Sequence, residues 1–183
     1  IASCLVGSEM CIRDRPASAK QLALKAQQSG IDPGVALTIS HIETGGKFNA
    51  DAQNSTSSAN GIFQVIDSSW KRLGGGNRAD LNEQIRIGLK HIKETNAYMA
   101  KQLGRDPVGS EQYLGHLLGP AGATKVLKAD PSTPLIDVVR SYDPKNANAI
   151  VKNNGMAGMT AGEAINKWQG KWNQLSSVSY THL

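Results

Sequence analysis

The chain has few aromatic residues, few cysteines and no long apolar run. Of its 183 residues, 5% are Phe, Trp or Tyr and only two are cysteine. Both cysteines, Cys4 and Cys11, stand close to the N-terminus, so the sequence predicts neither a disulfide framework nor a cysteine metal site. No apolar run approaches the ~18 residues that a membrane-spanning helix needs. What remains is a chain with 39% hydrophobic residues and enough length for one domain with a core.

The charges are scattered along the chain. The formal net charge is +5, from 20 Lys and Arg against 15 Asp and Glu. Because the basic residues form no cluster, nucleic-acid binding is not expected, and an anionic cell wall suits this charge as well. The four histidines have no spacing typical of a metal site, so neither a metal nor another cofactor is expected. The Gly-rich run 74–77 lacks the Lys of a phosphate-binding loop and predicts a flexible linker.

Both ends of the chain look foreign to the rest. Residues 4–15 and 177–183 resemble translated sequencing-adapter read-through and show no hydrophobic periodicity. We therefore expect residues 1–15 and 177–183 to be non-native tails, which leaves residues 16–176 as a single domain. On this interpretation the two cysteines say nothing about the redox compartment. The natural N-terminus, with any export signal or larger parent protein, is expected to lie outside this sequence.

The hydrophobic pattern predicts a mainly α fold of seven to nine short helices. Apolar residues recur at helical spacing, and Gly, Pro, Ser, Thr and Asp stand where helices are expected to begin or end. The expected helices cover residues 17–29, 32–44, 61–73, 80–103, 110–118, 121–128, 134–142, 146–153 and 160–172. Residues 44–60 are rich in Gly, Asn, Ser and Thr and predict a loop or irregular β structure.

In the expected helix over residues 61–73, Ile62, Val65 and Ile66 are expected to face inward. For the helix over residues 61–73 an alternative start is open, because Asp67 and Ser68 could instead cap a separate turn.

Two further helices have capping-box spacing at their starts. Asp80 with Glu83, and Thr160 with Glu163, place an acidic side chain three residues after a capping residue. Gly88, in the middle of the longest helix, costs stability unless another helix packs closely against it.

The sequence E-T-G-G at residues 43–46 ends the second expected helix. Glu43 follows Ile39 by one turn, so its carboxylate lies at the edge of an apolar face that includes Ile42. The negative end of the helix dipole and partial burial both disfavour the charged form, so the pKa of Glu43 should be raised. A raised pKa suits a general acid that works near neutral pH. The alternative is an ordinary solvated Glu in the last turn of a helix.

A second motif, S-S-A-N-G-I-F-Q at residues 57–64, follows Glu43. An E-[ST]-x-G sequence followed by S-x-A-x-G-[LI]-[FM]-Q resembles the soluble lytic transglycosylase family, relatives of goose-type lysozyme, and in particular its phage-encoded members. The resemblance covers residues 30–130, in round numbers. It implies a lysozyme-like helical domain with a small irregular or β region that lines a saccharide cleft.

The resemblance implies one catalytic residue and several substrate contacts. Glu43 would be the catalytic acid. Gly61 would allow close approach of the backbone, Phe63 would pack beneath the cleft, and Gln64 would hydrogen-bond a sugar.

Four further residues match the family's motifs less closely. The resemblance implies that one of the two serines, Ser57 or Ser58, helps to orient the catalytic Glu. Tyr113 matches the Tyr of the family's A-Y-N-A-G element, near the catalytic Glu, but Leu114 stands where the family has Asn. His116 could take over that polar role, or it is a histidine on a helix flank without a catalytic duty.

The family's chemistry uses a single carboxylic acid. The Glu protonates the leaving oxygen and then acts as base on the C6 hydroxyl of the same N-acetylmuramic acid, which closes a 1,6-anhydro ring. This internal hydroxyl has a high effective molarity, so the usual second carboxylate is not required. The expectation is thus a peptidoglycan lytic transglycosylase that acts on glycan strands, in the periplasm or cell wall or as part of a phage virion.

Two alternatives stay open. A goose-type muramidase would hydrolyse the same bond and would need Asp51 or Asp67 to position water opposite Glu43. A non-catalytic wall-binding virion module would keep the fold but would need no catalytic carboxylate.

Overall fold

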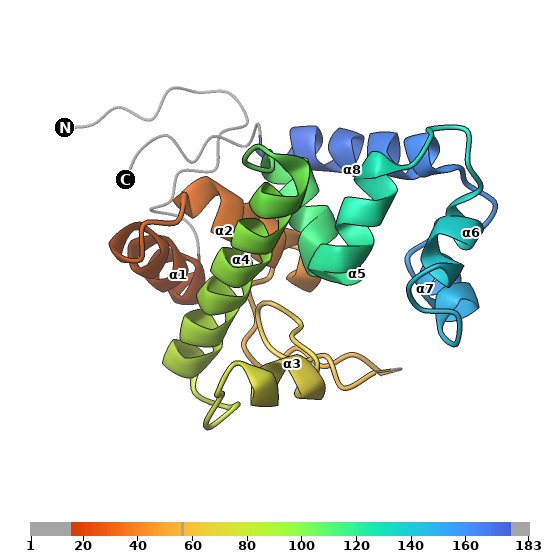
Figure 1. Ribbon diagram of the computed structural model, residues 1–183. Helices are drawn as coiled ribbons and strands as arrows, with labels where there is room; N and C mark the ends of the chain where they lie inside the picture. The colour runs from red at the N-terminus through yellow and green to blue at the C-terminus, as the bar shows by residue number, and fades with distance from the viewer. Residues whose placement is uncertain (1–15, 56, 177–183) are drawn as a thin grey trace. The chain divides into compact units, whose positions relative to one another are not determined.

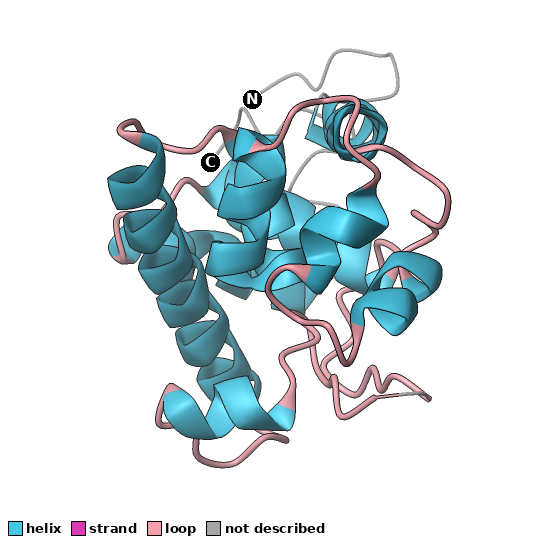
Figure 2. Cartoon of the chain, turned by 45° about the vertical axis from the view of Figure 1, so that its right-hand side comes forward, coloured by secondary structure: helices cyan, strands magenta, loops and turns pink. Residues whose placement is uncertain are grey.

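The described part of the chain is mainly α-helical. The computed structural model describes residues 16–55 and 57–176. Within these residues lie eight helices: α1 (Ala17–Gln28), α2 (Pro33–Thr44), α3 (Asp67–Arg72), α4 (Leu81–Leu103), α5 (Gly109–Lys128), α6 (Leu135–Arg140), α7 (Ala147–Asn153) and α8 (Ala161–Ser176). Extended pairing in the described residues is limited to isolated β-bridges, and Figure 2 accordingly shows helices joined by loops. The prediction of a mainly α fold is confirmed. The segments predicted to be non-native tails, including Cys4 and Cys11, lie outside the described residues.

The described helices belong to two compact units. The first unit consists of residues 16–93 and 174–176, and the second of residues 94–173. α1, α2, α3 and the start of α4 lie in the first unit. The end of α4, then α5, α6, α7 and most of α8 lie in the second. The prediction of a single domain over residues 16–176 stays a prediction.

In the first unit, α1 and α2 lie side by side (Figure 1). Leu22 of α1 is fully buried, whereas Leu24 is 52% exposed. Two residues along a helix correspond to a rotation of about 200°, so Leu22 and Leu24 cannot share a face. Leu22 therefore belongs to the core, and Leu24 lies on the exposed side of α1.

The ends of α2 agree with the local signals in the sequence. The Asp32 carboxylate accepts a hydrogen bond from the Gly34 N–H at 2.7 Å, and Pro33 occupies the first helical position. Gly45 ends the helix in the left-handed conformation, with φ of 60°.

The predicted helix over residues 61–73 is wrong in its first half. Gly61 has a φ of 81° and Gln64 a φ of 48°, and the residues between them form a turn. Residues in the left-handed region cannot continue a right-handed helix. α3 begins only at Asp67, close to the alternative start, but its N-cap is Ile66 and neither Asp67 nor Ser68 caps it. Ile66 is 44% exposed instead of facing inward.

The start of α4 differs from the predicted capping box. The Asp80 carboxylate does accept a hydrogen bond, from the Asn82 N–H at 2.9 Å. Glu83 does not reach back to the Asp80 N–H, which donates to a loop carbonyl. Its carboxylate accepts instead from the Gly76 N–H at 2.6 Å and pairs with Arg86. This part of the prediction is wrong, because a nearby loop competes for the acidic side chain.

In the second unit, the predicted helix break at Gly119 and Pro120 and the predicted start of the last helix agree with the structure. Gly119, with φ of 72° and ψ of 157°, interrupts α5 directly before Pro120. α6 and α7 lie side by side (Figure 1). The capping box at the start of α8 is confirmed: the Thr160 N–H donates to Glu163 Oε2 at 2.8 Å, and the Glu163 N–H donates to Thr160 Oγ1 at 3.2 Å.

Candidate active site

Glu43 lies in the last turn of α2. It is partly exposed, whereas the preceding residues 36–40 of the same helix are buried. Thr44, the second residue of the E-T-G-G motif, donates its hydroxyl to the Ser40 carbonyl at 2.7 Å and accepts from the Phe48 N–H at 2.9 Å. Phe48 is itself buried. Thr44 therefore ties the chain beyond the helix end back onto α2 and holds the segment that carries Glu43.

The G-I-F-Q residues form a tight turn with an unusual backbone. Gly61 and Gln64, its first and last residues, both have a positive φ. The Gly61 N–H donates to the Ala52 carbonyl at 2.8 Å, and the Gln64 N–H donates to the Gly61 carbonyl at 3.2 Å. A positive φ is unfavourable for a residue with a Cβ, so the conformation of Gln64 must be held by its surroundings.

The orientation of the Gln64 side-chain amide is fixed by its hydrogen bonds. Its Nε2 donates to the Gly61 carbonyl at 2.8 Å and to the Ala52 carbonyl at 3.0 Å. Because both partners are acceptors, only the amide nitrogen can face them, and both of its N–H groups are used. The residue is partly exposed. What Gln64 can offer to a ligand is its Oε1, as a hydrogen-bond acceptor.

Phe63 and Gly88 fit together. Phe63 is 1% exposed, and its ring lies against α4 at Gly88, where an added Cβ would come within 2.0 Å of the Phe63 Cδ2. The mid-helix glycine thus provides a close packing site, used by the ring of a turn instead of by another helix. Phe63 therefore anchors the turn in the core.

Gln84 of α4 was not predicted as a site residue, yet it joins three segments. It is 4% exposed. Its Oε1 accepts from the Ile62 N–H at 3.0 Å, and its Nε2 donates to the Ala50 carbonyl at 2.9 Å and to the Arg78 carbonyl at 2.8 Å. The available signal was a polar residue on the apolar face of a helix, one turn before Gly88.

Arg78 holds the residues that follow the turn. Its guanidinium donates to the Val65 carbonyl, forms an ion pair with Asp67, and lies over the Trp70 ring at 4.9 Å from the ring centroid. Gln84 and Arg78 thus fix the two ends of the segment that carries Phe63 and Gln64.

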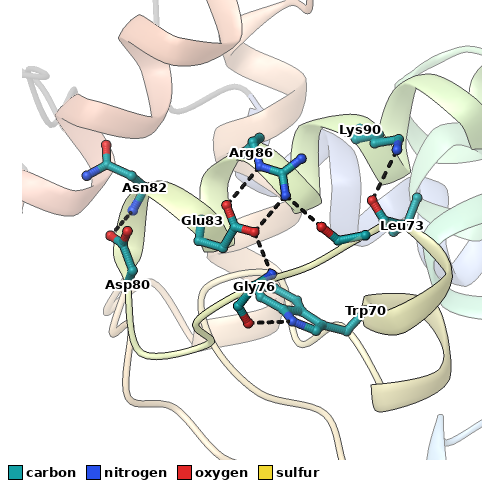
Figure 3. Close-up of polar contacts among 9 residues, drawn as sticks. Trp70, Leu73, Gly76, Asp80, Asn82, Glu83, Arg86 and Lys90 are labelled. Carbon is teal, nitrogen blue, oxygen red and sulfur yellow. Dashed lines mark hydrogen bonds and ion pairs between the residues drawn. The ribbon is translucent and has the colours of Figure 1, made fainter.

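A second loop is anchored to α4 by charges (Figure 3). Glu83 Oε1 accepts from the Gly76 N–H and from Arg86, each at 2.6 Å, and Arg86 also donates to the Gly74 carbonyl at 2.9 Å. The Trp70 Nε1 donates to the Gly76 carbonyl at 3.2 Å. The hydrogen bond from Arg86, followed by that from Gly76, lowers the pKa of Glu83 to about 2. The Gly-rich run, expected to be a flexible linker, is therefore held in place.

The two serines of the second motif are exposed and bond to nearby backbone. Ser57 Oγ accepts from the Ala59 N–H at 3.2 Å, and Ser58 Oγ accepts from the Asp67 N–H at 3.1 Å. Ser58 thereby supports the start of α3. The predicted role of either serine in orienting Glu43 stays a prediction.

Tyr113 and His116 belong to the second unit, where they form an aromatic cluster. Tyr113 is 3% exposed, and its ring centroid lies 5.0 Å from that of Trp168 and 6.3 Å from that of His116, with which it stacks at 25°. Leu114, at the position of the family's Asn, is 1% exposed. Substrate contacts of Tyr113 and His116 stay predictions.

No protein-family model matches this chain. Over residues 16–55 and 57–176, no three His, Cys, Asp or Glu side chains form a group that could hold a metal ion. In that same part of the chain, no helix is both long and apolar enough to cross a membrane. The predicted site residues that the first unit brings together are Gly61, Phe63 and Gln64, with Ser58 bordering their turn, and the second unit brings Tyr113 together with His116.

Proposed function

We propose that this chain is a peptidoglycan lytic transglycosylase with a lysozyme-like domain. It would bind peptidoglycan glycan strands, cleave the β-1,4 bond between N-acetylmuramic acid and N-acetylglucosamine, and leave a 1,6-anhydro ring. One observation carries the proposal: the motif glutamate, Glu43, stands in a tied-down helix end, and the G-I-F-Q motif forms a fixed turn with one acceptor available to a ligand.

The chemistry assigns both proton transfers to Glu43. Protonated Glu43 donates its proton to the glycosidic oxygen as the bond to the muramic acid C1 breaks. The carboxylate that results then takes the proton from the C6 hydroxyl, whose oxygen attacks C1. Glu43 is thereby protonated again, so the cycle consumes no water. The attacking hydroxyl belongs to the same sugar, which gives it a high effective molarity.

The first two acidic residues that follow Glu43 in the sequence, Asp51 and Asp67, favour this reaction over hydrolysis. A hydrolase uses a second carboxylate, held at a defined separation, to activate water. Asp67 is instead engaged by Arg78, and Asp51 is an exposed loop residue. Neither residue has the surroundings that would fix it toward a water molecule.

Gln64 would accept a hydrogen bond from a donor group of the saccharide. Since its two amide N–H groups are used by backbone carbonyls, its Oε1 would accept a hydrogen bond from an acetamido N–H or a hydroxyl. Both donors occur in N-acetylated glycan strands. The site of action would be the periplasm or cell wall, with the chain acting as part of a larger secreted or phage protein.

Loss of wall-degrading activity in Glu43→Gln tests the proposal. The substitution keeps the shape of the side chain and removes the proton donor. We expect the release of soluble fragments from purified peptidoglycan to fall by at least about 100-fold, with an unchanged melting temperature. Glu94→Gln, at an exposed position of α4, is the matched control and should retain full activity. Comparable activity in Glu43→Gln and the wild type would refute the assignment.

A further inference from the structure

We propose that Gln84 is a positioning residue, which sets the place of the saccharide-binding turn Gly61–Gln64 relative to α4. This inference rests on the proposed function, and it adds a residue that neither motif contains. Gln84 stands in α4, twenty positions after Gln64.

The three bonds of Gln84 reach three separate parts of the first unit. Its Oε1 accepts from the Ile62 N–H and so holds the turn itself. Its Nε2 donates to the Ala50 carbonyl in the preceding loop and to the Arg78 carbonyl in the segment before α4. The amide makes these bonds while almost completely buried. A buried polar group that loses its partner is costly, so this arrangement favours one position of the turn over its neighbours.

Steric contact adds to the hydrogen bonds. At Gly61, which opens the turn, an added Cβ would lie 2.4 Å from Gln84 Oε1, so the amide and the turn backbone touch. At the other end of the turn, Gln64 keeps a positive φ that it would leave if the backbone were free to relax. The Gln84 amide thus restrains the turn at the side where it meets α4.

The consequence for binding follows from the polarity of Gln64. Its Oε1 is directed by the two bonds from its amide nitrogen to Gly61 and Ala52. Both carbonyls belong to the segment that Gln84 fixes. If the turn shifts, the acceptor shifts with it, and saccharide binding should weaken while the proton transfers at Glu43 proceed as before.

Two near-isosteric variants test this role. Gln84→Met keeps the length of the side chain and removes all three hydrogen bonds. Gln84→Glu keeps an acceptor for Ile62 and replaces the two donors by an oxygen. Gln27→Met, at an exposed position of α1, is the matched control. For each protein, exchange of the Ile62 amide hydrogen is measured together with kcat and KM on soluble, uncross-linked glycan strands, well below the melting temperature.

We expect Gln84→Met to raise KM about tenfold with kcat changed less than about threefold, and Ile62 exchange to be at least about tenfold faster. Gln84→Glu should raise KM as well, and Gln27→Met should change nothing. Unchanged Ile62 exchange in both Gln84 variants would overturn the inference, whatever the activity. Faster exchange of the Ile62 amide hydrogen with an unaltered KM would also overturn it. A loss of kcat without a change in KM would do the same. If the wild type cleaves no glycan, the proposed function fails, and the exchange rates still decide whether Gln84 fixes the turn.

Discussion

Two consecutive residues of α4 anchor two loops in opposite chemical ways. Glu83 holds the Gly74–Gly76 loop through a carboxylate that pairs with the exposed Arg86. Gln84 holds the Ala50–Gln64 loop through a neutral amide that is 4% exposed. A charge is costly to bury, whereas an amide with satisfied hydrogen bonds tolerates burial.

The difference indicates which loop depends on solution conditions. The charged anchor should weaken with acid and with salt, because both act on an exposed ion pair. The neutral anchor should respond to neither. The hydrogen bonds from Gln84 to the turn with the motif residues are thus the contacts that do not depend on pH, which suits a site whose proton transfers belong to Glu43.

The largest effect should come from filling the space at Gly88, where Phe63 packs. Gly88→Val should destabilise the chain by about 3 kcal/mol, because the added side chain would overlap the buried ring of Phe63. Urea unfolding measures the loss. The control is Gly170→Ala in α8, where nothing lies within 4 Å of the added Cβ, and there a gain of about 0.5–1 kcal/mol is expected. Equal effects at the two glycines would contradict the packing of Phe63 on Gly88.

A pair of glycines with similar backbone compares the two loops directly. Gly61 and Gly74 have φ of 81° and 74°, so Ala at either position meets the same strain of about 1 kcal/mol. Only at Gly61 would the added Cβ collide with the Gln84 amide. Gly61→Ala should therefore cost about 2 kcal/mol and reduce activity, and Gly74→Ala should cost about 1 kcal/mol and leave activity intact. Thermal unfolding and wall-degradation assays separate these outcomes.

The charged anchor should show a defined pH window. The pKa of Glu83 is lowered from 4.5 to about 2, so its stabilising effect is fully present above about pH 5 and is lost as pH falls toward 2. Glu83→Gln should be less stable than the wild type by up to about 1 kcal/mol at pH 7, with the difference vanishing near pH 2.

Urea unfolding at a series of pH values measures this difference. The corresponding difference for Gln84→Met should stay constant over the same range, since no group in that anchor titrates there. A difference for Glu83→Gln that grows on acidification would contradict the ion pair.

The smallest effect should come from salt. Raising NaCl from about 0.1 M to about 1 M shortens the screening length from ~10 Å to ~3 Å. The stability difference between the wild type and Glu83→Gln should shrink by roughly 0.3 kcal/mol, while that of Gln84→Met should not change. Denaturation midpoints in paired salt series are sufficient to detect it. A salt dependence of the same size in both variants would remove the distinction between the anchors.

Much of the helical architecture could be predicted because its signals are local. The cap at Asp32, the stop at Gly45 and the box of Thr160 with Glu163 each depend on residues within one helical turn. The box expected at Asp80 failed for the opposite reason. Glu83 found a partner in Gly76, seven positions earlier and in a loop whose path no local pattern reveals.

The candidate site divides in the same way. Glu43 and Gln64 stand in recognisable motifs, so the sequence alone identified them as candidates. The turn was predicted as helix, since Ile62, Val65 and Ile66 mimic a helical face. Its actual shape depends on Gln84, which is distant in the sequence. A single polar residue in an apolar pattern does not show which groups it will hydrogen-bond.

The most direct test of the central claim is the mass of the reaction products. Purified peptidoglycan is digested with the wild-type chain, and the muramic acid ends are analysed by mass spectrometry. If Glu43 acts alone, the dominant ends are 1,6-anhydro rings, one water lighter than reducing ends, and Glu43→Gln releases none. Dominant reducing ends, together with inactive Asp51→Asn or Asp67→Asn, would contradict the account and establish a hydrolase with a second carboxylate.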